Sequence, residues 1–116
     1  MNIAICYYGL SGGNNDKNDP VSIDYPWKNM KKYIISNNIE RGHKFDIFLH
    51  TWEFNTSTSY KNKLIDRYKP VKCKIDKRIK FNDDVKYNSI YSRWYSHSKV
   101  IELKQQYESE NNFEYD

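Results

Sequence analysis

Three short groups of residues carry side chains or backbone groups that could bind a ligand. The first is the run Gly9-Leu10-Ser11-Gly12-Gly13, which follows a hydrophobic stretch. Glycines at the end of a strand can turn the chain sharply and present backbone N–H groups to a phosphate. The run has neither the G-x-G-x-x-G spacing of dinucleotide-binding loops nor the Gly-Lys-Ser/Thr ending of a Walker A loop. A plain turn is therefore an equal alternative.

The second group is His50 and Trp52, at the end of Phe45–Trp52, the most hydrophobic run of the chain. Near neutral pH the imidazole could act as a general base or bind an anionic or sugar ligand. Its alternative is a histidine whose ring is satisfied by a backbone carbonyl. The indole could stack on a base or a sugar ring, with a lid over the core as the alternative.

The third group is Ser92 and Arg93, expected in the first turns of a long helix. The guanidinium of Arg93 is the best candidate for a two-pronged contact with a phosphate or carboxylate. The alternative is a solvated Arg93 beside a Trp94 that belongs to the core.

No catalytic residue and no metal site can be assigned from spacing. Asp83-Asp84 is expected to be exposed in a charged loop. Cys6 and Cys73 lie in different expected strands without metal-ligand spacing, which favours ordinary buried thiols. The histidines have no fixed spacing from a nucleophile, so no catalytic triad is predicted; they are His43, His50 and His97.

Composition indicates one folded domain. The chain has 116 residues, a net charge of +4 and a mean hydropathy of −0.98, yet 16% of its residues are aromatic. Such aromatic content is untypical of disorder and predicts a core built on large rings. No secretory signal and no apolar run of membrane-spanning length is visible. We therefore expect a cytoplasmic protein, in a virus-infected host if the gene is viral.

The hydrophobic pattern predicts an α/β fold. It is Rossmann-like, with a mostly parallel sheet of three to four strands flanked by helices. The first strand, apolar on both faces, is expected to be central, and the third to lie at or near an edge. Strands are expected at Ile3–Tyr8, Phe45–Trp52 and Val71–Ile75, with a further strand opening at Phe113–Asp116. Helices are expected from about Asp24, over Tyr60–Tyr68 and over Ser89–Glu110.

Two helical stripes are expected to face the core. The first helix should turn an apolar row inward at helical spacing, formed by Trp27, Met30 and Ile34. The long helix should bury a wider row, formed by Ile90, Trp94, His97 and Ile101 and extended by Val100, Leu103 and Tyr107.

The order of these motifs resembles a loose group of glycosyltransferase-like proteins from giant viruses, phages and bacterial surface-polysaccharide loci. The resemblance rests on three stretches spread over nearly the whole chain. They are Ile3–Gly13, the run Phe-Asp-Ile-Phe-Leu-His-Thr-Trp at 45–52, and Ser92-Arg93-Trp94-Tyr95-Ser96 with Glu102-Leu103-Lys104.

The resemblance implies the N-terminal, nucleotide-sugar-binding half of a GT-A-like fold. Residues 1–116 would form this half as a single domain. In that group a strand like Phe113–Asp116 leads to an acidic motif that holds a metal and the diphosphate, then to an acceptor half. This sequence ends before both, so we expect a truncated chain. Mn²⁺ or Mg²⁺ would be needed only if that motif were supplied elsewhere. The implied substrate-binding residues are Tyr8, Gly9, Leu10, Ser11, Gly12, His50, Trp52, Ser92 and Arg93.

The function implied is binding of a nucleotide sugar and its transfer to a glycan acceptor, and assignment as an enzyme stays open. One alternative is a basic, aromatic-rich nucleic-acid-binding module that uses Tyr7, Tyr8 and Trp52. It is less favoured, because those rings are needed for the core and no known recognition motif is present. Another is a non-catalytic remnant that associates with itself or a second chain through its open C-terminal edge.

Overall fold

The computed structural model describes residues 1–9, 23–53 and 58–116, with only the backbone described at 58–60. Leu10, Ser11 and Gly12 therefore lie outside the described residues. No helix in the described ranges is long and apolar enough to cross a membrane.

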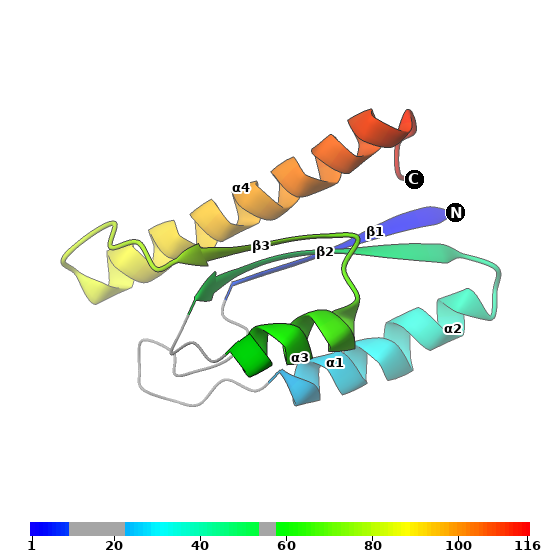
Figure 1. Ribbon diagram of the computed structural model, residues 1–116, viewed down its shortest axis with the longest axis horizontal. Coiled ribbons are helices and arrows are strands. Elements are labelled where there is room, and N and C mark those ends of the chain that lie inside the picture. The colour runs from blue at the N-terminus through cyan, green and yellow to red at the C-terminus, as the bar shows by residue number, and fades with distance from the viewer. Residues whose placement is uncertain (10–22, 54–57) are drawn as a thin grey trace.

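A parallel three-stranded sheet forms the centre of the molecule and confirms the predicted α/β, Rossmann-like fold class (Figure 1). The strands are β1 (Asn2–Gly9), β2 (Lys44–Glu53) and β3 (Lys72–Lys77), in the order β1-β2-β3. β2 is central because it pairs with β1 over Lys44–Thr51 and with β3 over Phe48–Glu53. Its run of apolar residues is buried on both faces, as expected of an interior parallel strand.

Helices cover both faces of the sheet (Figure 1). On one face lie α1 (Asp24–Met30), η1 (Lys31–Ile35) and α2 (Ser36–Ile39), which run on from one another, together with α3 (Thr58–Tyr68). The long α4 (Val85–Asn111) lies alone on the opposite face. Sheet and helices on the first face enclose the apolar core, which comprises Ile23, Ile47, Leu49, Leu64 and Tyr68 with Ile5, Tyr7, Trp27, Ile35, Cys73 and Ile75 packed against them.

The predicted central position of the first strand is wrong for the described sheet, where β1 lies at an edge. The C-terminal residues approach the outer side of this strand. The Asn2 N–H donates to the Asp116 carboxylate at 2.6 Å, and the Asp116 N–H donates to the Asn2 carbonyl at 2.9 Å. Phe113–Asp116 is not a strand, contrary to expectation, although its end already lies beside β1.

The inward stripe of the first helix differs from expectation at Ile34, which is 44% exposed. The cause is the π-helical segment η1, since a wider turn shifts every following residue around the helix axis. Ile35 consequently packs against the core in its place. Trp27 does face the core as predicted, with its ring 4.9 Å from that of Tyr68.

The long helix begins at Val85, four residues before the predicted start at Ser89. Asp84 has an extended backbone and its carboxylate accepts the N–H groups of Lys86 and Tyr87, so it is an N-cap. The prediction that Trp94 belongs to the core is wrong, because this side chain is 65% exposed.

The face of α4 that packs on the sheet instead carries Ser96 and Val100, both fully buried. Val100 confirms part of the predicted row. Ile90 is 42% exposed and does not belong to it, because the sheet-facing side of the helix is rotated from the predicted one.

Replacing Phe48, which is fully buried, with Ala should lower the free energy of unfolding by about 3–5 kcal/mol, because it leaves a cavity between β2 and α4. Trp94→Ala removes an even larger ring but should change it by no more than about 0.5 kcal/mol. Urea denaturation followed by circular dichroism measures both. A Trp94→Ala cost similar to that of Phe48→Ala would place Trp94 in the core after all.

Candidate functional site

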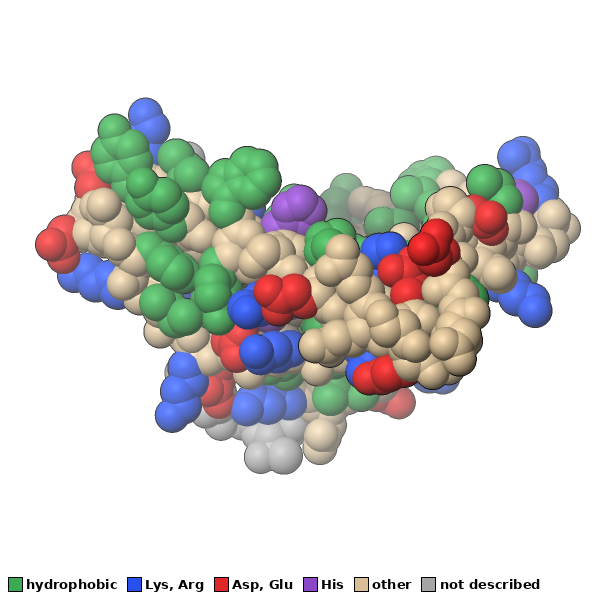
Figure 2. Space-filling view, turned by 90° about the horizontal axis from the view of Figure 1, so that it is seen from above, with side chains coloured by type: hydrophobic (Ala, Val, Ile, Leu, Met, Phe, Trp, Pro, Cys, Tyr) green, Lys and Arg blue, Asp and Glu red, His purple; other side chains and the backbone are tan. Residues whose placement is uncertain are grey.

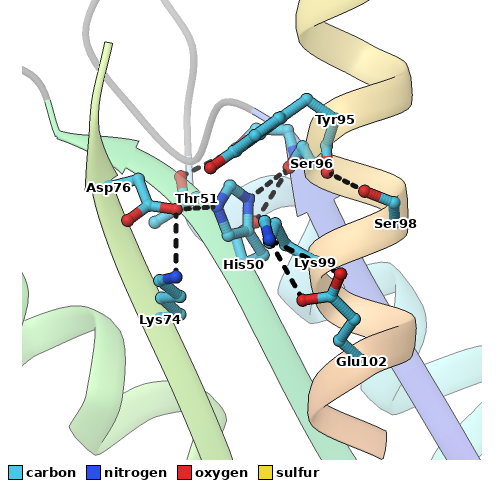
Figure 3. A network of polar contacts seen from close by, with 10 residues as sticks. His50, Thr51, Lys74, Asp76, Tyr95, Ser96, Ser98, Lys99 and Glu102 are labelled. Atoms are coloured by element: carbon cyan, nitrogen blue, oxygen red, sulfur yellow. Dashed lines mark hydrogen bonds and ion pairs between the residues drawn. The ribbon is translucent and has the colours of Figure 1, made fainter. Parts of the chain in front are cut away.

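The carboxyl ends of all three strands meet at one edge of the sheet, where parallel α/β folds commonly bind ligands. The first half of α4 lies across the same edge. Here a chain of hydrogen bonds joins four elements (Figure 3). His50 Nδ1 lies 2.6 Å from Ser96 Oγ on α4, and His50 Nε2 lies 2.9 Å from Asp76 Oδ2 on β3.

The network continues from α4 to β1. The Gly9 N–H donates to Ser96 Oγ at 2.8 Å, and the Thr51 hydroxyl donates to the Gly9 carbonyl, also at 2.8 Å. Gly9 has a φ of +102°, a conformation that residues with a side chain rarely adopt. Gly9 is thus held by β2 and α4 together, at the point where β1 ends.

These contacts define the protonation of the buried His50 ring. A carboxylate can only accept, so Nε2–H donates to Asp76. In the neutral ring Nδ1 carries no proton and accepts the Ser96 hydroxyl, which also lies 3.4 Å from the His50 carbonyl oxygen. Burial lowers the pKa of His50, while the hydrogen bond and negative charge of Asp76 raise it, and the nearby Lys74 and Lys99 lower it. The net direction is downward, so the neutral ring is favoured.

The hydrogen-bonded chain Asp76–His50–Ser96 has the connectivity of a serine-hydrolase triad, but the burial of Ser96 excludes that chemistry. Ser96 is fully buried and its oxygen already accepts the Gly9 N–H, so no substrate carbonyl can reach it in this conformation. The same burial separates His50 from a bound ligand. The network therefore joins the carboxyl ends of the strands to α4 from within, and its buried Ser96 is not placed to act as a nucleophile.

Trp52 lies directly beside this network and is only 2% exposed. Its ring is stacked on Tyr95 of α4, with centroids 5.3 Å apart at 27°, and meets the His50 ring edge-on at 5.3 Å. Phe81 closes the cluster at 6.3 Å. This packing matches the alternative in which Trp52 covers the core, and it leaves only a small part of the indole facing outward.

A pocket of about 470 Å³ opens at the carboxyl ends of β2 and β3, in front of Trp52. Its volume is in the range that holds small molecules. Asn88 of α4 organises one wall, because its side-chain oxygen accepts the N–H groups of Phe81 and Asn82. The lining residues are Trp52, Arg78, Ile79, Lys80, Asn82, Asp83, Val85, Asn88 and Ser92.

The residues singled out in the sequence are thus divided between different places. Trp52 and Ser92 line the pocket, whereas Gly9 and His50 belong to the buried network behind it. Tyr8 is 46% exposed and its ring lies 4.9 Å from that of His97 on α4. Arg93 is exposed on α4 and is absent from the pocket lining.

Sequence reasoning missed Asp76, Ser96 and the pocket cations Arg78 and Lys80. Ser96 lies 46 residues from His50 and Asp76 lies 26 residues from it, so no short motif contains them. No composition signal marks Ser96, because α4 also contains Ser89, Ser92, Ser98 and Ser109. Only knowledge of which helix face is buried would have distinguished it from the other serines.

Neither a metal nor a reactive thiol is indicated by the described residues. Within them, no group of three or more His, Cys, Asp or Glu side chains could hold a metal ion. Both cysteines are free thiols, and burial raises the pKa of Cys6 and raises that of Cys73 to about 11. Thiols with raised pKa values are poor nucleophiles at neutral pH.

Comparison with known proteins yielded no match among protein-family models, curated proteins or solved structures. The class of the protein is therefore given by its own architecture, a parallel α/β sheet with a pocket at the carboxyl ends of its strands.

The lowered pKa of His50 makes stability depend on pH. Below about pH 6.5, the ordinary value for histidine, the unfolded chain binds a proton on His50 that the folded chain does not. The free energy of unfolding should therefore fall with decreasing pH from about 6.5, by up to about 1.4 kcal/mol per pH unit from this residue. Urea denaturation between about pH 5 and 7.5 measures the slope.

His50→Gln should flatten that slope whatever its effect on absolute stability. The control His97→Gln leaves the His50 network intact, so the dependence that the network causes should survive it. An unchanged slope in His50→Gln would contradict this account of the buried ring.

Proposed function

We propose that this chain binds a nucleoside diphosphate sugar in the pocket at the carboxyl ends of β2 and β3, as part of a glycosyltransferase-like protein. The observation that carries the proposal is the pocket itself, which combines cationic, hydroxyl and amide groups at the ligand-binding edge of a parallel sheet.

The charge of the pocket favours an anionic ligand. Arg78 and Lys80 both line it, and a guanidinium can donate two parallel hydrogen bonds to a phosphate. Lys80 pairs with Asp83 at 2.8 Å, but both side chains are highly exposed, at 73% and 97%. Such exposed pairs contribute little energy, so a diphosphate can take over the ammonium at low cost.

The remaining lining suits the uncharged part of the ligand. Asn82, Asn88 and Ser92 offer amide and hydroxyl groups for a sugar, while the Trp52 indole and Ile79 provide an apolar wall. The resemblance of the motif order to that of glycosyltransferase-like proteins favours a nucleotide sugar in particular. Transfer to a glycan acceptor would follow from the same resemblance.

A divalent cation would neutralise the leaving diphosphate in such a transfer. The described residues offer no cluster to hold one. The function proposed for the described residues is consequently donor binding, with the cation and the acceptor groups supplied by residues outside them.

Uridine, guanosine, thymidine and cytidine diphosphates and their sugar conjugates, with and without Mn²⁺, should be screened by thermal shift. A ligand at about 100 times its Kd adds about 2.7 kcal/mol and clearly raises the melting temperature. We expect one nucleotide family to do so, and Arg78→Ala or Lys80→Ala to weaken its binding roughly tenfold, a typical effect of losing one charged hydrogen bond.

The control is Arg41→Ala, which removes an exposed arginine in the turn that precedes β2, at the opposite end of the sheet. It should bind as the unchanged protein does. A cooperative melt that no nucleotide shifts at millimolar concentration would refute the proposal, and so would a shift that both pocket variants retain in full.

A further inference from the structure

The first half of α4 has an apolar face that points away from the sheet. Tyr87, Ile90, Tyr91 and Trp94 are 53%, 42%, 50% and 65% exposed. They are spaced at i, i+3, i+4 and i+7, so they form one continuous row, here called the outer stripe. Viewed from the α4 side, hydrophobic side chains gather over this part of the helix (Figure 2).

The outer stripe is large for an exposed surface. A free aromatic side chain presents about 200 Å², so three half-exposed rings and Ile90 leave roughly 400 Å² of mainly apolar area. Patches of that size on soluble proteins are often binding sites. The same side of the helix becomes polar further along, at Ser98, Glu102 and Gln105, which confines the feature to 87–94.

A row of two basic side chains and a histidine runs along one flank of the outer stripe. Lys86 and Arg93 are seven residues apart, two helical turns, and therefore lie on the same side of α4. His97 follows one turn later and contacts Tyr8 of β1. Lys86 and Arg93 are exposed, and neither forms an ion pair with a described residue.

We propose that the outer stripe and its basic flank bind single-stranded nucleic acid. Exposed rings in a row are platforms on which unpaired bases stack, and a parallel line of cations follows the phosphates. The positive net charge of +4 favours approach of a polyanion. A duplex fits less well, because its bases are already stacked on one another.

The flank also argues against a second copy of the chain as the occupant. An antiparallel pair of α4 helices across a two-fold axis would present the same flank of each helix to the other. Lys86 and Arg93 of one copy would then approach those of its partner, and like charges repel. The negatively charged backbone of a single-stranded nucleic acid meets no such repulsion.

This site is separate from the proposed nucleotide-sugar pocket. Ser92 and Asn88 line that pocket from another side of α4, and no residue of the outer stripe lies in its lining. A negative result for binding at one site therefore leaves the proposal for the other site untouched.

Binding of a fluorescein-labelled oligothymidylate of about 12 nucleotides should be followed by anisotropy at several salt concentrations. We expect affinity to fall steeply as salt rises, because bound cations displace counterions from the phosphates. Trp94→Ala should weaken binding about tenfold or more through lost stacking. Arg93→Ala should reduce the slope of log affinity against log salt by about one.

The matched control is Tyr33→Ala in η1. Tyr33 is 62% exposed and has the Lys32 ammonium 4.9 Å from its ring centre, so it offers the same chemistry on the other side of the sheet. This variant should bind normally, and circular dichroism should show that all variants are folded.

Three outcomes would overturn the proposal. One is the absence of salt-dependent binding, and another is binding lost in Tyr33→Ala but kept in Trp94→Ala. The third is a dimer in analytical ultracentrifugation that Trp94→Ala dissociates, which would make the outer stripe an interface between copies.

Discussion

The hydrogen bonds of the buried His50 ring hold together the edge of the sheet at which the proposed pocket lies. His50 is the only described histidine that is fully buried, and it reaches β3 through Asp76 and α4 through Ser96. Ser96 in turn holds the N–H of Gly9 at the end of β1. Three hydrogen bonds thus join β1, β2, β3 and α4, which are far apart in the sequence.

This arrangement explains why α4 can be apolar on its outer face without losing its position. Ser96 anchors the helix by polar contacts, and Val100 and Phe48 fill the interface behind it. The outward rings of the first half, Tyr87, Tyr91 and Trp94, are therefore left half-exposed or more. Two surfaces result on different sides of one helix: a polar pocket towards β3 and an aromatic row towards solvent.

Much of the fold could be predicted because its strands are strongly apolar. Phe45–Trp52 is buried on both faces, and this identified a central parallel strand with a polar exit. The helix boundaries were good to a few residues, since proline, asparagine and glycine interrupt the pattern. The position of β1 could not be predicted in the same way, because an apolar strand sequence does not reveal how many neighbours it has.

The site was harder to predict, for two physical reasons. Hydrogen bonds between His50 and its partners join residues far apart in the sequence, so spacing carries no information about them. In α4, large apolar residues occupy both sides of the helix, so periodicity alone selected the face of Trp94 and missed that of Ser96. A helix with one apolar side would have given the correct face.

The three tryptophans allow a direct test of the central claim, that the pocket in front of Trp52 receives a nucleotide. Their indole N–H groups should give three NMR signals, assignable by Trp→Phe substitution, from the pocket, the outer stripe and the core. Titration with the diphosphate that raises the melting temperature should move the Trp52 signal and leave those of Trp27 and Trp94 in place. Movement of the Trp94 signal alone, or of none of the three, would contradict the account.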